Sequence, residues 1–419
     1  MAEQAVLDLE SIDSRYVRNP YPLYAMMRDR MPVRQIELHG LRGWLVTRYE
    51  DVRHVLSDRT LSHDRSRANA EARSAAWLFA DEAFDLQHHM LRSDPPAHGR
   101  MRRLVAPAFA PARIGQLRGR ITKVANELID GFDDREDVDL ISEFAFPLPL
   151  QIIIELLGLP ANDHDMLQRW SNVLSSGQAA GEEEISTTLR RMRDYFDDLA
   201  VRWRDDDSGD GLFGVLVDAW RRSLISQAEL LSSAFQLLQG GHVTTLGLIA
   251  NATLALLCRP LLLKAAHDDV DVLDGAVDEF MRFDPPMEVA TIRFTTTELQ
   301  IGPTTIPGGG EPVILALASA NRDRGRYRRP DVVDVRRDAS DHLAFGWGPH
   351  HCIGAHLGRL ETRVALRQLV GRLESLELAV NPSQLAWRPN PHLRRPEQLP
   401  IRFTSVLDRD TRGSAGAAR

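Results

Sequence analysis

Hydrophobic and polar positions alternate over residues 33–47, VRQIELHGLRGWLVT, around Gly40 and Gly43. A period of two predicts a β-hairpin, and TRYEDVRHVLSD after it has the sequence of a capped helix start. From about Asp94 to Arg282 apolar residues recur at helical spacing, as in EISTTLRRMRDYFDDLAVRW. That spacing is typical of amphipathic helices, so the body of the protein is predicted to be mostly α-helical.

The segment from Ser226 to Cys258 lacks proline and is apolar on almost every face after Ala234. This pattern predicts a helix that is buried on all sides. At ~1.5 Å per residue the helix is roughly 45 to 50 Å long, enough to cross a domain of this size. Its middle contains the pair Gly240-Gly241, and each glycine inside a helix costs about 1 kcal/mol. We expect close packing or a groove at this point.

After Asp284 the pattern changes to short strands and loops. TIRFTTTELQIG is followed by a Pro-Gly-Gly-Gly turn and then by EPVILALASA, which is predicted to be a buried strand. A last helix is predicted from Ala355 to Leu373. The predicted fold class is therefore mainly α with small β-sheets (α+β).

The 419 residues are 43% hydrophobic, so the chain can bury a large core. The formal charge of −8 argues against nucleic acid as the main partner. Cys258 and Cys352 are the only cysteines, fewer than a disulfide framework in a secreted protein of this size normally needs, which favours a reducing, cytoplasmic location. The N-terminal residues have no signal-peptide pattern, and the apolar stretch from Phe146 to Pro160 is too short to span a bilayer. We expect a buried helix there and no membrane attachment.

The segment with the most specific chemistry is FGWGPHHCIGAHLGRLETRVALRQLVGRL. Glycines and a proline precede Cys352 and a helix follows it, so the sulfur lies at a helix N-terminus, where the helix dipole stabilises thiolate over thiol. Gly348 and Gly354 allow backbone amides to approach the sulfur closely. These features predict a cysteine that can bind a metal ion.

Phe345, Gly348, Cys352 and Gly354 match the pattern F-x-x-G-x-x-x-C-x-G, by which the chain resembles the bacterial cytochrome P450 family. The resemblance extends from about residue 20 to residue 403. It implies a cytochrome P450 fold that binds haem b, with Cys352 as the iron ligand. It also implies that Phe345 packs near the sulfur and that His350 reaches a haem propionate. Residues 1–405 are expected to form one catalytic domain, and residues 406–419 a disordered tail.

Two alternatives from other classes stay open. His350, His351, Cys352 and His356 cluster in sequence, so the loop can instead be interpreted as part of a zinc-stabilised helical scaffold. A structural zinc site usually has paired ligands at two separated stations, and Cys258 offers no second pair. The other alternative is a haem-binding sensor of gas or redox state that has no turnover.

Other segments match the family in the right order. Glu279 and Arg282 form an E-x-x-R element, and the resemblance makes Arg337 their third partner in a structural cluster. Taken alone, such a pair is usually solvated. Haem propionates need cationic or donor partners, because an unpaired buried charge is costly. The resemblance assigns this role to His98 and Arg102, which are four residues apart, and to Arg293.

The segment Gly240-Gly241-His242-Val243-Thr244-Thr245 aligns with the family pattern A/G-G-x-D/E-T-T. The resemblance places Gly241 beside the cofactor and makes Thr244 and Thr245 the catalytic residues, with Thr244 facing dioxygen. A bond from a threonine hydroxyl to a carbonyl one turn back is the structural alternative. Val243 stands where the family has an acid, and a positioned acid contributes ~10² to 10⁴ in rate. We expect His242, ordered water or the substrate to replace it, or else a reaction such as phenol coupling or desaturation.

The resemblance also suggests how substrate and electrons reach the cofactor. It implies a small organic substrate, typically a polyketide, peptide or terpenoid, either free or attached to a carrier protein. Its expected apolar pocket consists of Trp77, Leu78, Phe84, Met90, Met287, Val289 and Ile292. His88 and His89 are interpreted as surface residues, with contact to a polar substrate group as the alternative.

Electrons are expected from a ferredoxin and its reductase, because the chain has no flavin domain and no iron-sulfur cysteine set. The residues expected to form the docking face are Arg103, Arg113, Arg359 and Arg363. Ordinary solvated arginine is the alternative at each of them. We expect the chain to act as a monomer.

Overall fold

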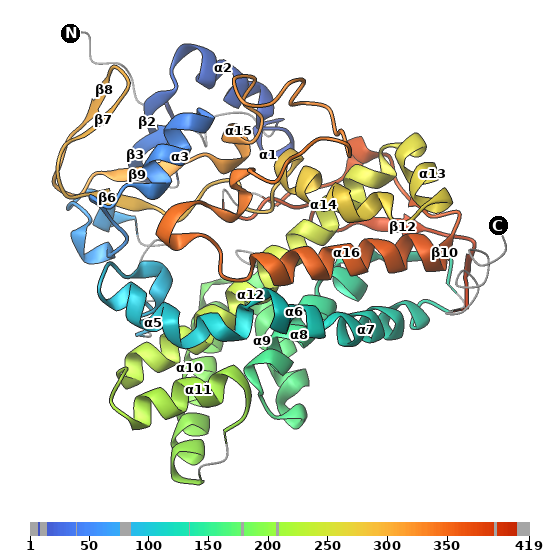
Figure 1. The fold of residues 1–419 in the computed structure, drawn as a ribbon, viewed down its shortest axis with the longest axis horizontal. Helices are drawn as coiled ribbons and strands as arrows, with labels where there is room; N and C mark the ends of the chain where they lie inside the picture. Colours follow the sequence, from blue (N-terminus) through green and yellow to red (C-terminus); the bar gives the residue numbers. More distant parts are fainter. Residues whose placement is uncertain are drawn as a thin grey trace.

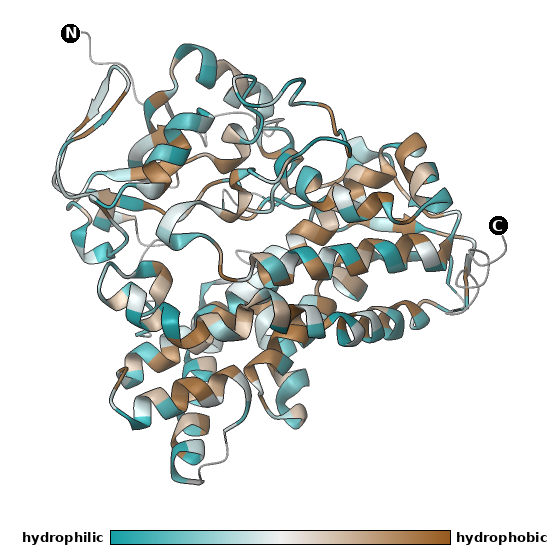
Figure 2. Ribbon diagram, viewed as in Figure 1, coloured by the Kyte–Doolittle hydropathy of each residue, from teal (hydrophilic) through white to brown (hydrophobic). Residues whose placement is uncertain are grey.

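The computed structural model describes residues 7–8, 15–38, 40–75, 85–133, 135–176, 180–206, 209–388 and 392–408. A sheet-containing lobe with β2, β3 and β9 lies on one side of the molecule, and the long helices α7, α12 and α16 form the body beside it (Figure 1). The mainly α fold with small sheets predicted from the sequence is confirmed. Along α7 and α16, hydrophobic and hydrophilic residues alternate, as expected for helices that cover a core (Figure 2).

The helical body contains these elements: α5 (Ala97–Val105), α6 (Pro111–Gln116), α7 (Arg118–Asp130), α8 (Pro147–Leu157), α9 (His164–Ser176), α10 (Glu182–Asp206), α11 (Gly211–Arg221), α12 (Gln227–Leu257), α13 (Pro260–Asp268), α14 (Val272–Phe283) and α16 (Ala355–Arg372). Three shorter helices accompany the sheet, namely α2 (Tyr21–Arg30), α3 (Tyr49–Ser57) and α15 (Leu317–Ala320), and α1 (Arg15–Arg18) precedes them. The buried helix predicted within residues 146–160 is α8, and the predicted last helix is α16.

In the described part of the chain the largest sheet has six strands in the order β1-β2-β3-β9-β6-β4. Its strands are β1 (Leu7–Asp8), β2 (Val33–Leu38), β3 (Leu41–Val46), β9 (Pro312–Leu315), β6 (Arg293–Thr295) and β4 (Leu61–Ser62). The predicted hairpin is β2-β3, paired from Val33 with Val46 to Leu38 with Leu41. This sheet brings Arg293, at the start of β6, and His63, directly after β4, to the same side of the core. Both residues belong to the candidate site described below.

Two local predictions were wrong. Helix α3 has Arg48 at its N-cap without a side-chain cap, because the Thr47 hydroxyl donates to the carbonyl of Pro32 instead. The strand predicted for EPVILALASA ends at Leu315, and α15 follows, because the N–H groups of Ala320 and Asn321 donate to the carbonyls one helical turn back, at Ala316 and Leu317.

The remaining strands form small peripheral sheets. They are β7 (Leu299–Ile301) with β8 (Thr304–Ile306), β5 (Asp137–Asp139) with β12 (Pro400–Arg402) and β11 (Glu377–Leu378), and β10 (Leu373–Glu374) with β13 (Ser405–Val406). Val406 pairs with Leu373, and the N–H of Leu407 donates to the carbonyl of Arg372. The chain is thus packed beyond the expected start of the tail at residue 406, and residues 409–419 lie outside the described part.

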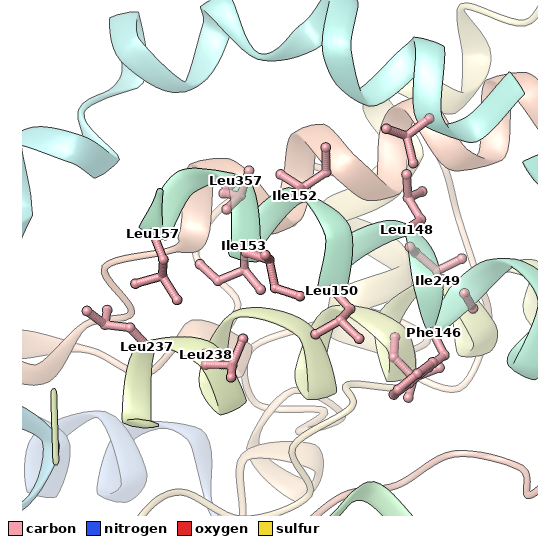
Figure 3. Close-up of a cluster of buried hydrophobic side chains, with 14 of the residues drawn as sticks. Phe146, Leu148, Leu150, Ile152, Ile153, Leu157, Leu237, Leu238, Ile249 and Leu357 are labelled. Atoms are coloured by element: carbon pink, nitrogen blue, oxygen red, sulfur yellow. The ribbon is translucent and has the colours of Figure 1, made fainter. Parts of the chain in front are cut away.

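Helix α12 runs through the centre of the molecule. Ser226 and Glu229 form a capping box at its N-terminus, and it ends at Leu257, as the apolar pattern predicted. Side chains from α8 and α12 interlock along its middle (Figure 3). A Cβ atom at Gly241 would lie 2.5 Å from Cγ1 of Ile153 on α8. Glycine is therefore required there by close helix packing.

By length and composition α12 could cross a membrane, and among the described residues it is the one helix that passes this test. However, 78% of its most apolar window is buried inside the protein. Burying a large apolar side chain contributes about 1.5–3 kcal/mol, and this helix contributes many of them, including Leu230, Leu238, Leu246 and Ile249. Its apolar character is that of a core helix.

Candidate functional site

One cavity lies between α12, α5, the segment after α14 and the loop that precedes α16. We call it the main cavity. The predicted catalytic and cofactor-binding residues all line it: His98, Arg102, Gly241, Thr244, Thr245, Arg293, Phe345, His350, Cys352 and Gly354. Its empty volume, including its mouth, is about 1370 Å³. This figure includes open space at the mouth, and the cavity is lined mainly by apolar side chains with a few polar groups, as is typical of small-molecule sites.

The cysteine loop is held by the backbone. The N–H of Cys352 donates to the carbonyl of Phe345 at 2.9 Å, and α16 begins three residues after the cysteine. Gly348 has φ +76°, and a Cβ atom there would lie 3.0 Å from the carbonyl oxygen of Leu56. Glycine is therefore needed on both conformational and steric grounds. The loop can turn tightly enough to point Cys352 into the main cavity.

The side chain of Cys352 is accessible, although protein surrounds it, because the surface that it exposes is that of the main cavity. Burial raises the pKa of its thiol above the usual value. The backbone N–H of Gly354 and the guanidinium groups of Arg102 and Arg359 lower that pKa, but by less. The expected stabilisation of a thiolate is thus outweighed by desolvation. A bound metal ion deprotonates a coordinating thiol outright.

Three imidazole rings stack beside the cysteine loop, and we call them the imidazole column. The ring of His350 lies between His63, at 3.6 Å between centroids and 17°, and His98, at 4.0 Å and 29°. Burial lowers the pKa of His350 to about 3 and that of His63 to about 2, and the neighbouring imidazoles and Arg293 add to both shifts. Nε2 of His98 and Nδ1 of His63 are buried without a hydrogen-bond partner. His63 was missed by sequence analysis, because only the fold brings it to His350.

Two arginines complete this wall. Arg102 donates from Nη2 to the carbonyl of His351 at 2.8 Å, and Arg293 donates from Nη1 to the carbonyl of Thr291 at 2.9 Å. Arg293 is only 2% exposed, and burial lowers its pKa to about 10. No aspartate or glutamate is among the described residues that line the main cavity. The wall therefore presents buried cations and imidazoles that lack an anionic counterpart.

The opposite wall is the middle of α12. The hydroxyl of Thr244 donates to the carbonyl of Gly240 at 3.1 Å, and that of Thr245 donates to the carbonyl of Gly241 at 3.4 Å. Both threonines also line the main cavity. Each therefore bonds to a carbonyl of its own helix and still contacts the space in which a ligand would bind.

His242 lies on the other face of α12. Its Nδ1 is 2.7 Å from the carbonyl of Leu238, its ring packs edge-on against Phe146, and its side chain is 0% exposed. Burial lowers its pKa to about 4. His242 does not line the main cavity, so it cannot deliver protons there, and one of the three expected replacements for an acid at Val243 is removed.

Glu361 on α16 is an acid that sequence analysis missed. It is 0% exposed, and neither carboxyl oxygen has a hydrogen bond of normal geometry. Burial raises its pKa well above the usual value, while the nearby hydroxyl of Thr245 lowers it by less. The missed signal was its spacing, because Glu361 lies four residues from both Leu357 and Ala365 on the buried face of its helix.

Glu279, Arg282 and Arg337 come together as the sequence suggested, and we call them the Glu279 cluster. Arg282 donates from Nε to Oε2 of Glu279 at 2.7 Å, and Nε of Arg337 lies 3.2 Å from the same oxygen. Glu279 and Arg282 are 0% exposed, so the solvated interpretation of this pair is wrong. Arg282 also donates to the carbonyls of Asn321 and Pro330. The cluster ties α14 to the long loop that leads to Cys352.

The expected substrate pocket is only partly reproduced. Met90 and Met287 line the main cavity, whereas Val289 packs in the core and lines no described cavity. Ile292 lines a neighbouring second cavity, together with His89. His89 is 4% exposed, so its interpretation as a surface residue is wrong. The positions of Trp77, Leu78 and Phe84 lie outside the described residues.

The zinc alternative finds no supporting geometry. Within the described ranges no three His, Cys, Asp or Glu side chains are grouped as metal ligands. A structural zinc ion normally takes four. The side chains of His350, His351, Cys352 and His356 are thus not arranged as a zinc site.

The comparisons with known proteins agree on one family. Residues 219–386 match the family description "Cytochrome P450". Cytochrome P450 107B1 of Saccharopolyspora erythraea is 38% identical over 413 residues, covering 96% of this chain and 99% of the relative. The monooxygenase PikC of Streptomyces venezuelae is 38% identical over 407 residues, with 96% and 95% covered. The tirandamycin C-bound structure of the monooxygenase TamI superposes with TM-score 0.87 at 37% identity, covering 95% of this chain and 100% of TamI.

This chain belongs to the cytochrome P450 family. It is a bacterial P450 monooxygenase, and its cofactor is haem b. The residues of the main cavity fit that group. One wall offers a thiol, and the imidazole column with Arg102 and Arg293 offers donors for two carboxylates. Apolar side chains such as Leu237, Leu248 and Leu357 supply the contacts for a flat hydrophobic ring system.

Proposed function

We propose that this P450 oxidises a small natural-product intermediate in the main cavity, using dioxygen and electrons from a ferredoxin. The observation that carries the proposal is the convergence, in one cavity, of a cysteine thiol, a cation-rich wall and the threonines of α12. Haem bound there supplies the iron at which dioxygen is activated. The protein groups bind and orient the reactants, exclude water and move protons.

We assign Cys352 as the residue whose sulfur would bind the haem iron. The carbonyl of Phe345 accepts from the N–H of Cys352, and the N–H of Gly354 bonds to the sulfur and lowers its pKa. Hydrogen bonds of this kind tune how strongly a thiolate donates to iron. His98, Arg102, Arg293 and His350 hold the propionates, and the imidazole column adds His63 to this set. Their unpartnered nitrogens and the buried guanidinium of Arg293 support this assignment.

Gly241, Thr244 and Thr245 line the opposite wall of the main cavity, where they would contact bound haem and dioxygen. The absence of an acid at residue 243 requires another source of protons, and Glu361 is suited to this role. Burial raises its pKa, which favours the protonated carboxyl group, and the hydroxyl of Thr245 lies next to it. A hydroxyl both donates and accepts, so Thr245 can pass a proton from Glu361 into the main cavity.

The substrate class is supported by relatives. The curated relatives include "Mycinamicin IV hydroxylase/epoxidase" of Micromonospora griseorubida at 36% identity. P450BioI, a structural relative at 30% identity and TM-score 0.83, was solved with an acyl carrier protein that carries hexadec-9Z-enoic acid. A secondary-metabolite intermediate, free or carrier-bound, is therefore the substrate that we propose. A cytoplasmic location and a monomeric state remain predictions.

For electron transfer we propose a docking face centred on Arg103 and Arg113, which are exposed. Arg359 and Arg363 are engaged on the protein itself, at 2.7 Å from Asp278 and 3.5 Å from Asp274. The expected arginines thus divide into two exposed residues and two that hold α16 against α14.

The test is the optical spectrum of the reduced, carbon monoxide-treated protein, followed by a substrate screen. We expect a thiolate-type band, a spin-state shift with a true substrate and NADPH consumption in the presence of ferredoxin and its reductase. A protein that shows the thiolate-type band but oxidises none of the compounds that change its spin state would instead be the haem-binding sensor. A colourless protein contradicts both.

A further inference from the structure

A carboxylate on α14 holds the chain on both sides of the cysteine loop. Helices α14 and α16 lie side by side (Figure 1). Oδ1 of Asp278, on α14, accepts from Nε of Arg359 at 2.7 Å and lies 3.1 Å from Nε2 of His342. His342 precedes Cys352 in the chain, and Arg359 follows it on α16, so one oxygen atom connects the segment that enters the loop to the helix that leaves it. We call Asp278, His342 and Arg359 the Asp278 group.

His342 acts in this group as a neutral donor. Its Nδ1 accepts from the N–H of Ala344 at 3.1 Å, so the ring proton lies on Nε2, which donates to Asp278. The side chain of His342 is 0% exposed, and burial lowers its pKa. The same imidazole caps the short helix Leu343–Phe345. The hydrogen bond to Asp278 thus helps to fix the start of the cysteine loop without adding a charge.

Asp278 and Arg359 form a pair of opposite charges beside the loop. Burial opposes ionisation of Asp278, but the hydrogen bonds from His342 and Arg359 and the guanidinium charge lower the pKa of its carboxyl group to about 2. Cζ of Arg359 lies 4.5 Å from the centroid of the Phe345 ring, and the carbonyl of Phe345 accepts from the N–H of Cys352. The guanidinium charge also acts at the sulfur, where it opposes the rise in the pKa of the Cys352 thiol that burial causes. The side chain of Arg359 is 22% exposed, so solvent screens its charge only in part.

We propose that Asp278 is a positioning residue that sets, through Arg359, the reduction potential of the haem bound at Cys352. This inference rests on the proposed function, because it requires the sulfur of Cys352 to bind the iron. Reduction of ferric to ferrous haem adds one electron, which comes from the ferredoxin, and no bond within the Asp278 group forms or breaks. A nearby positive charge favours the reduced form. Asp278 offsets the charge of Arg359 and thereby keeps the reduction potential lower than Arg359 alone would make it.

The experiment measures the reduction potential of the haem-loaded protein by anaerobic titration with dithionite, followed by absorption. Asp278→Asn removes the negative charge and leaves that of Arg359, so at a fixed solution potential the ratio of ferrous to ferric protein should rise about threefold. Arg359→Gln removes the positive charge and leaves that of Asp278, so the ratio should fall about threefold. The double variant keeps the net charge of the pair and should return the ratio to that of the unaltered protein.

A second ion pair between the same two helices provides the matched control. Nη1 of Arg367 on α16 lies 2.7 Å from Oδ1 of Asp271, which precedes α14. Arg367 follows Arg359 by about two helical turns, so it is roughly 12 Å further along α16 from the cysteine loop. Asp271→Asn and Arg367→Gln change the charge in the same way as the two test variants. We expect both controls to leave the ratio unchanged.

The direction of the shifts separates this inference from a merely structural role. If the group only held the fold together, both single variants would shift the potential in the same direction and the double variant would shift it most, which would overturn the inference. Arg359→Lys keeps the charge and should keep the ratio, so a ratio as low as in Arg359→Gln would overturn the inference even if Asp278→Asn failed to fold. A thiolate-type spectrum without these opposite shifts overturns this inference alone, whereas absence of that spectrum in the unaltered protein overturns the proposed function as well.

Discussion

The imidazole ring of His350, in the cysteine loop, lies parallel to that of His63, which follows strand β4, with 3.6 Å between their centroids. His98 covers the other face of His350. Two of these rings carry a nitrogen without a partner, and Arg293 stands close enough to shift the pKa values of His63 and His350. The column and the arginine together define one anion-binding wall.

Removing His63 should therefore weaken haem binding. In His63→Leu we expect haem to transfer to apomyoglobin roughly 10-fold faster, because groups that support a metal ligand typically contribute 10- to 100-fold in affinity. His54→Leu, at an exposed position on α3, is the control and should leave the rate unchanged. Equal transfer rates for the two variants would show that His63 plays no part in holding the cofactor.

Glu361→Gln should impair proton delivery. We expect product formation to fall by about 10²-fold, with more NADPH oxidised per product, since a positioned acid contributes 10² to 10⁴. The measurement is the ratio of product to NADPH consumed, with the rate in heavy water to identify a proton step. Val243→Glu should bring no large gain, because Glu361 already supplies the acid. A large gain in that variant, or normal coupling in Glu361→Gln, contradicts the assignment.

The Glu279 cluster should be essential for stability. Glu279→Gln leaves Arg282 buried without its anion, and breaking a buried pair in this way costs about 3–5 kcal/mol. Glu143→Gln removes a partly exposed pair with Arg135 and should cost less than about 1 kcal/mol. Chemical unfolding of both variants measures the difference. Similar losses would mean that the cluster contributes no more than a surface pair.

His242 should make the fold sensitive to acid. Its pKa is about 4 in the folded protein and near 6.5 when unfolded, so the unfolded state binds more protons between these values. The contribution of His242 to the free energy of unfolding is fully present above pH 6.5. It decreases by about 3 kcal/mol in total as the pH falls to 4. His242→Leu should lose less stability than the unaltered protein between pH 7 and pH 5 in urea unfolding. If the stability of His242→Leu depended on pH as that of the unaltered protein does, His242 would not be the source of the acid sensitivity.

Structural elements that consist of contiguous residues could be predicted from the sequence, because short-range patterns of residue types determine them. The β2-β3 hairpin, helix α12 and the glycine-bounded cysteine loop are of this kind. The roles of His63 and Glu361 and the existence of the second cavity could not be predicted, because each depends on contacts between residues that are distant in the chain. The direction of the pKa shift of Cys352 was also missed, because the extent of burial cannot be read from a helix start.

The sulfur–iron bond is the central claim, and Cys352→Ser tests it most directly. The variant is purified, reduced and treated with carbon monoxide, and its absorption spectrum is compared with that of the unaltered protein. We expect the thiolate-type band to be lost, because a serine oxygen cannot replace the sulfur as donor. A variant that retains haem with an unaltered thiolate-type band would contradict the assignment of Cys352.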